Sequence, residues 1–198
     1  MNFPLYHDLA FDFLYAFAGI LVFVIFERAL YLSYLGLRAR RIGRSVRAAD
    51  EALPLTLKKS SARDPITRAV MRYSGLAATH GVTRGQLEDF SAALYIDVDK
   101  KISARLWVLD TIITGAPLLG LLGTILGIMQ TFTALSQGGI SDPTEVSHGI
   151  GLALTATASG IATALLGLLG HNILNRQAQL LTEEFKFLVL RLTPPSIG

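Results

Sequence analysis

Three long stretches of this chain are apolar enough to cross a membrane as helices. Two of them, 111–141 and 146–175, contain no Asp, Glu, Lys or Arg, and a third, 13–37, is interrupted only by Glu27 and Arg28. A bilayer core about 30 Å thick needs about 20 apolar residues of helix. The pattern therefore predicts an all-α integral membrane protein with three transmembrane helices, at 13–37, 109–135 and 147–173.

The composition agrees with this class. Of 198 residues, 51% are hydrophobic, 17% are charged and none is cysteine, whereas soluble domains carry about 25% charged residues. These figures exclude a disordered chain, a disulfide scaffold and a cysteine-based metal site.

The basic residues give the expected orientation. Lys and Arg are absent from 1–27 and 106–175, and they gather in 38–105 and in the C-terminal tail. Basic loops stay in the cytoplasm. We therefore expect 38–108 and 174–198 to be cytoplasmic helical segments, and 1–12 and the 136–146 loop to lie outside. The basic run 38–47 is explained by this topology, and it would also contact anionic lipid headgroups. No nucleic-acid partner is therefore expected.

The cytoplasmic residues read as helices that extend the second and third crossings. Thr83 and Gln86 have the spacing of a capping box, and apolar residues follow at helical spacing as far as the membrane. We expect one helix from about 84 to 135, and a tail helix over 177–192 that continues the third crossing. Leu53-Pro54, Asp64-Pro65 and Pro194-Pro195 are expected to break or end helices.

Small residues distinguish the second and third crossings from the first, which is bulky and suits a lipid-facing cover. Small residues let helix backbones approach closely in lipid, so we expect these two crossings to pack against other helices. Pro117 favours a kink, either as a packing feature or with a further role. The helix-packing candidates are Gly120, Gly123, Gly127 and Pro117 in the second crossing and Gly160 in the third.

The sequence carries no phosphate loop, metal-ligand cluster or nucleophile–base pattern, so we expect neither an enzyme nor a cofactor. The membrane segments offer hydroxyls, which relay a proton but cannot hold its charge. A proton path would therefore need a carboxylate from a partner. Each hydroxyl could instead bond its own helix turn. The candidates are Thr124, Thr131, Thr155, Thr157 and Ser159.

The run 115–129, GAPLLGLLGTILGIM, resembles the signature of the MotA/TolQ/ExbB proton-channel family, whose ExbB/TolQ branch carries AP-x-x-GL-x-GT-x-x-GIM. The run ALTATASG at 153–160 is similar to that branch's AL-x-x-TA-x-G, and Asn172 and the pair Glu27-Arg28 also match the pattern. The resemblance implies that Thr124 and Thr157 line a pore.

The same resemblance implies the partners. It points to a pentamer in the bacterial inner membrane, with a periplasmic N-terminus, around an ExbD/TolR-like single-span protein that supplies an aspartate. The assembly would use the proton-motive force to drive a TonB-like transducer. A TolQ-like envelope motor and a passive scaffold without proton conduction are the alternatives, and the short cytoplasmic loop argues against a flagellar stator.

Three positions depart from the family pattern. Leu152 stands where the family often has a glutamate, and Glu145 and His148, one to two turns outward, are candidate substitutes. Leu166 replaces a proline, and His171 stands in the place of a tyrosine.

Overall fold

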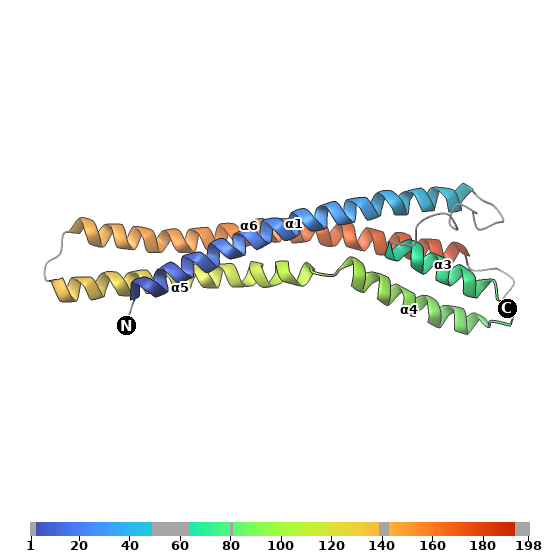
Figure 1. The fold of residues 1–198 in the computed structure, drawn as a ribbon, viewed down its shortest axis with the longest axis horizontal. Coiled ribbons are helices and arrows are strands. Elements are labelled where there is room, and N and C mark those ends of the chain that lie inside the picture. The colour runs from blue at the N-terminus through green and yellow to red at the C-terminus, as the bar shows by residue number, and fades with distance from the viewer. Residues whose placement is uncertain (1–2, 49–63, 80, 139–142, 193–198) are drawn as a thin grey trace. The chain divides into compact units, whose positions relative to one another are not determined.

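The computed structural model describes residues 3–48, 64–79, 81–138 and 143–192. These residues form helices and no strand, which confirms the predicted all-α class (Figure 1). The predicted break at Leu53-Pro54 lies outside the described residues. The helices are α1 (Phe3–Ala48), α3 (Pro65–Ala77), α4 (Arg84–Ile102), α5 (Leu106–Gly138) and α6 (Pro143–Leu192).

The chain divides into two compact units. Unit 1 comprises Met1–Glu27 and Arg105–Asn172, and unit 2 comprises Arg28–Ala104 and Ile173–Gly198. Unit 1 therefore holds all of α5 with the first parts of α1 and α6, and unit 2 holds α3 and α4 with the remainder of those two helices.

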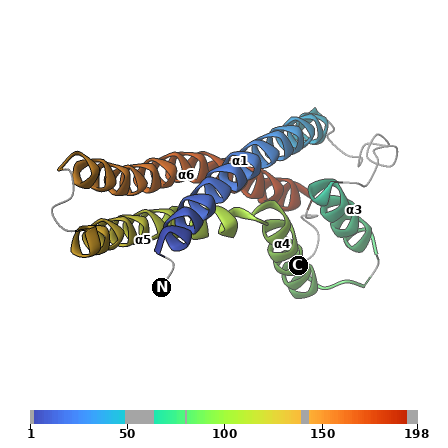
Figure 2. The ribbon, with the colours of Figure 1, turned by 60° about the vertical axis from the view of Figure 1, so that its left-hand side comes forward.

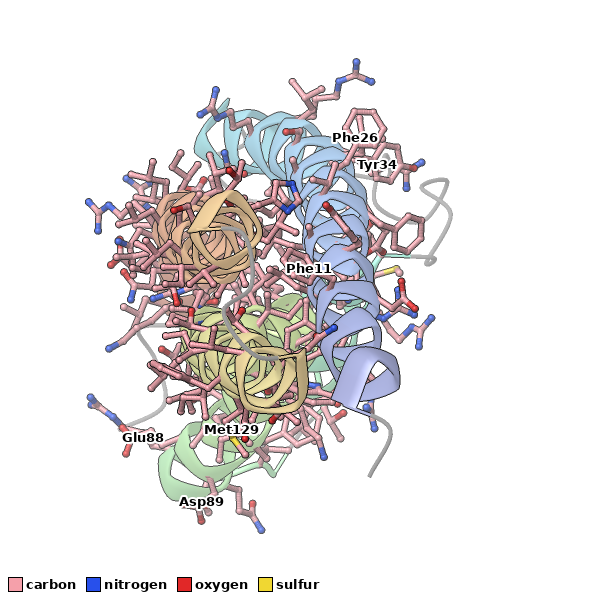
Figure 3. The ribbon with its side chains drawn as sticks, turned by 90° about the vertical axis from the view of Figure 1, so that its left-hand side faces the viewer. Phe11, Phe26, Tyr34, Glu88, Asp89 and Met129 are labelled. Carbon is pink, nitrogen blue, oxygen red and sulfur yellow. The ribbon has the colours of Figure 1, made fainter. Side chains whose placement is uncertain are left out.

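Three of the described helices are long and apolar enough to cross a membrane, as the sequence predicts. The candidate spans are Phe11–Arg41, Leu106–Thr133 and Val146–Leu192, with mean hydropathies of 2.0, 2.0 and 1.8. Large apolar side chains such as Phe23, Leu118 and Leu169 are more than 60% exposed on them, and Phe26 points outward from α1 (Figure 3). Such surfaces suit a membrane or other copies of the chain.

The prediction of one continuous helix over 84–135 is wrong. Ser103 caps α4, and α5 begins at Leu106. Between them Arg105 adopts a left-handed backbone conformation with φ of 69°. A residue in this conformation interrupts a helix, because its carbonyl group no longer points along the helix axis. Periodicity does not reveal this break, since Ile102 and Leu106 on either side of it are both buried.

The other helix boundaries extend the predicted segments. The tail continues the third crossing without interruption, because α6 runs from Pro143 to Leu192. Pro194-Pro195 lies outside the described residues. Helix α1 begins at Phe3, so most of the segment 1–12 is helical, and α5 and α6 reach into the 136–146 segment from both sides. Helix α5 runs through Pro117.

In unit 2, α3 packs against α4 (Figure 2). Asp64 is the N-cap of α3 and Pro65 its first helical residue, a combination that starts helices efficiently. Thr83 and Gln86 form the predicted capping box at the start of α4. Tyr73 of α3 and Leu94 and Val98 of α4 are buried.

Replacing Asp64 by alanine is expected to destabilise α3 by about 1–3 kcal/mol, because a buried cap and an ion pair are lost together. Asp64 accepts hydrogen bonds from the amide and hydroxyl of Thr67, each at 2.7 Å, and lies 3.4 Å from Arg38. Hydrogen exchange of amides 66–77 measures the effect. Asp64→Asn keeps a good cap and should retain most protection, and Asp89→Ala, at an exposed position on α4 (Figure 3), is the control. Equal protection in D64A and D89A would contradict this role.

Candidate functional site

Two glycines bring the backbones of α5 and α6 into contact in unit 1. A Cβ atom built on Gly120 would lie 2.7 Å from the Ala156 carbonyl oxygen, and one on Gly160 would lie 2.5 Å from the Ala116 carbonyl oxygen. No side chain fits at these distances. The reciprocal pattern, a glycine of each helix against an alanine carbonyl of the other, therefore sets the separation of α5 and α6.

The remaining packing candidates also lie within unit 1. Gly123 and Gly127 are buried, and Pro117 is half-buried inside α5. Helix α1 places bulky side chains against other glycines: Phe17 lies against Gly115, and Leu21 and Ile25 lie against Gly167 and Gly170 of α6. The predicted cover helix thus has one face that fits α5 and α6.

Thr124 and Thr157 meet at this close approach. Their hydroxyls are within hydrogen-bond distance of each other. Thr124 Oγ1 also lies 2.9 Å from the Ala153 carbonyl and 3.2 Å from the Gly120 carbonyl, and Thr157 Oγ1 lies 3.1 Å from the same Gly120 carbonyl. The pair has two hydroxyl protons for four hydrogen-bond contacts, so the protons can be arranged in more than one way. A group with this property can pass a proton along or orient a water molecule.

The other candidate hydroxyls do not join this pair. Thr155 is exposed and donates to the Gly151 carbonyl at 2.8 Å, and Thr131 donates to the Gly127 carbonyl at 2.9 Å. Ser159 is half-buried, and its carbonyl accepts from the Thr163 hydroxyl at 2.8 Å. Thr155, Thr131 and Thr163 thus follow the ordinary pattern in which a hydroxyl bonds its own helix turn.

Charged groups of unit 1 pair where the uncharged stretches end. Glu27 of α1 lies 3.2 Å from Arg105, the residue before α5. His171 Nε2 of α6 lies 3.3 Å from Asp110 Oδ1 of α5. Arg105 thus gives Glu27 a basic partner at the start of α5. In unit 2, Arg28 is buried, and its guanidinium lies 5.2 Å from the centre of the Tyr31 ring.

The sequence did not point to Arg105 or Asp110 as site residues, and His171 stands out in it only as a departure from the family pattern. A signal was available, because Asp110 and His171 are the first titratable residues beyond the stretches 111–141 and 149–170. Predicting that these two residues pair would have required the register of the antiparallel helices α5 and α6, which cannot be read from the sequence.

The remaining predicted positions stand apart from the threonine pair. His148 and Asn172 are exposed on α6, and Leu152 is 44% exposed. Glu145 lies in the first turns of α6, and its side chain is outside the described residues. No group of three or more metal-ligating side chains occurs among the residues that the structure describes.

Comparison with known proteins places these features in a family context. Residues 58–186 match the sequence model of the MotA/TolQ/ExbB proton channel family. Over 181 residues, the chain is 33% identical to the biopolymer transport protein "ExbB-like 3" of Synechocystis, covering 86% of this chain and 84% of that one. It is also 33% identical over 110 residues to the biopolymer transport protein ExbB of Aquifex aeolicus, covering 56% and 69% of the two chains. A third relative, ExbB of Helicobacter pylori, is 38% identical over 96 residues, covering 48% and 63%.

Proposed function

Because this chain belongs to the MotA/TolQ/ExbB proton channel family, we propose that it is an ExbB-like stator subunit. In this proposal it forms a proton channel with a single-span partner and converts proton flow into mechanical work. Relatives named as biopolymer transport proteins support the ExbB-like role. The finer assignment depends on the chemistry of unit 1.

The observation that carries the proposal is the hydroxyl pair of Thr124 and Thr157. Both side chains are half-buried inside spans that hold no carboxylate, histidine or lysine over 111–141 and 149–170. A carboxylate in a membrane is costly and needs polar neighbours. A hydroxyl pair with alternative proton arrangements provides such neighbours without adding a charge.

The titratable group itself must therefore come from a partner. An ExbD/TolR-like single-span helix with an intramembrane aspartate fits this requirement, and a TonB-like transducer would be the load. The exposed apolar faces of α1, α5 and α6 would be covered by lipid and by further copies of this chain, with five copies expected. We place the assembly in a bacterial inner membrane, with the N-terminus periplasmic and the C-terminus cytoplasmic because of the basic residues.

Two alternatives remain as outcomes of the test. A TolQ-like envelope motor would use the same membrane chemistry with a different load. A passive scaffold is favoured by one observation: the carbonyls of Gly120 and Ala153 already accept hydrogen bonds from the two threonine hydroxyls.

Native mass spectrometry of the membrane-extracted protein tests the proposal. The protein would be prepared alone and co-expressed with an ExbD/TolR-like protein of the same genome, and the complex would then be reconstituted for proton-flux measurements. We expect a ring of identical chains that captures the partner, and flux only when both proteins are present. A homo-oligomer that never captures such a partner and never conducts would establish the scaffold.

A further inference from the structure

The uncharged stretches of α5 and α6 end at one contact. Asp110 is the residue before the stretch 111–141, and His171 is the residue after the stretch 149–170. Their side chains meet, with 3.3 Å between His171 Nε2 and Asp110 Oδ1. A titratable pair thus lies at the end of the uncharged stretches of the two helices that hold the threonine pair.

The two partners differ in exposure. The His171 side chain is 19% exposed, whereas the Asp110 side chain is 61% exposed. The imidazole is therefore mostly packed in unit 1, while the carboxylate lies at the surface of this chain.

The pair lies on the same two helices as the threonine hydroxyls. His171 is fourteen residues after Thr157 on the continuous helix α6, which is about 21 Å at 1.5 Å per residue. Thr163, whose side chain is buried, lies between them on α6, and Thr114 Oγ1 donates to the Asp110 carbonyl at 2.9 Å on α5. These separations require water or a moving carrier between the groups.

Unit 1 also holds a second charged pair. From α1, Glu27 pairs with Arg105, the residue that precedes α5. Arg28 is next to Glu27 in sequence and belongs to unit 2, where it is buried beside Tyr31. Within unit 1, Asp110 is the carboxylate that faces His171.

We propose that His171, held by Asp110, accepts protons at the cytoplasmic end of the proton path. The inference rests on the proposed function. In the step, a protonated carrier, namely the partner carboxylic acid or a water chain connected to it, gives its proton to Nδ1 of neutral His171. The carrier is left as a carboxylate, and His171 becomes an imidazolium. The imidazolium then releases its Nε2 proton to water on the Asp110 side. The neutral ring, now protonated on Nδ1, regains the starting tautomer by proton exchange with water.

The chemistry of the two groups suits this role. Imidazole is the side chain whose ordinary titration falls between pH 5 and 8. Because Nε2 faces Asp110, Nδ1 is the nitrogen available to accept. Asp110 is a positioning residue, because its contact with Nε2 fixes the direction in which the ring presents Nδ1. A tyrosine at this position would remain protonated and could not accept a proton at neutral pH.

The test measures proton flux in proteoliposomes that contain the whole complex with its single-span partner. A potassium-diffusion potential drives the flux at equal pH on both sides, from pH 5.5 to 8. His171→Gln should lower flux about tenfold at pH 7.5 and change the shape of the pH profile, because the group that accepts the proton is lost. Asp110→Asn should lower flux by less, because an amide of the same shape still lies beside Nε2.

Controls separate a chemical role from a structural one. His80→Gln removes another histidine, between α3 and α4 in the sequence, and should change nothing. In His171→Ala, added imidazole should restore part of the flux. An H171Q complex that keeps full flux and an unchanged pH profile would overturn the role of His171, while loss of flux in Thr157→Val would show that the channel itself is correctly assigned. If the unmodified complex never conducts, both proposals fail.

Discussion

Gly160→Leu is expected to prevent α5 and α6 from packing, so that little folded protein remains in mild detergent. A Cβ atom alone at this position would lie 2.5 Å from the Ala116 carbonyl oxygen and 3.1 Å from Gly120 Cα. These are backbone atoms and cannot rotate away, so the helices must separate. Adding a few methylene groups to a packed core typically lowers the free energy of unfolding by about 1–3 kcal/mol. The loss in Gly160→Leu should reach or exceed the upper end of this range. Gly160→Ala should be less stable than the unmodified protein and more stable than Gly160→Leu.

Unfolding by SDS, followed through the single tryptophan Trp107 at the start of α5, measures this effect. Gly151→Leu on the same helix is the matched control, since nothing lies within 4 Å of a Cβ atom there. We expect G151L to unfold near the midpoint of the unmodified protein and G160L far below it. Similar midpoints for G160L and the unmodified protein would mean that α5 and α6 do not approach as described.

Thr157→Val is expected to abolish most proton flux while leaving the assembly intact. Valine has nearly the same shape as threonine, so the packing against Gly120 is kept. The Thr157 hydroxyl, however, contacts both Thr124 Oγ1 and the Gly120 carbonyl, and its loss removes the alternative proton arrangements of the pair. Interhelical hydrogen bonds in membranes contribute about 0.6 kcal/mol on average, so stability should change little, whereas flux should fall by about two orders of magnitude.

Flux in proteoliposomes and partner capture by native mass spectrometry provide the two measurements for T157V. Thr124→Val should behave in the same way, because it removes the other half of the pair. Thr133→Val is the matched control, since the Thr133 hydroxyl bonds the Met129 carbonyl of its own helix at 2.8 Å. Full flux in T157V and T124V would remove the threonine pair from the proton path.

Much of the helical architecture could be predicted because local chemistry encodes it. Long stretches without charged residues form membrane-spanning helices, and this does not depend on how the rest of the chain folds. The capping box at Thr83 and Gln86 and the start of α3 at Asp64-Pro65 each depend on residues within one turn. The break at Arg105 escaped prediction because arginine carries no preference for the left-handed backbone that it adopts.

The candidate site was less accessible from the sequence. Helical spacing gave no reason to choose Thr124 and Thr157 over Thr131 or Thr155, and the choice came from a resemblance. The structure distinguishes them, because it brings the first two together across α5 and α6 and leaves the others bonded to their own turns.

The sequence by itself determined that this protein is helical and that it has three membrane-spanning helices. It also determined that the stretches 111–141 and 149–170 hold hydroxyls but no group able to carry a proton's charge. Those properties follow from composition and local periodicity. Only the tertiary structure decided which small residues touch, which hydroxyls share protons, and that Asp110 faces His171. The physical reason is that such contacts depend on the register between two antiparallel helices, which is set by packing at Gly120 and Gly160 and not by either helix alone.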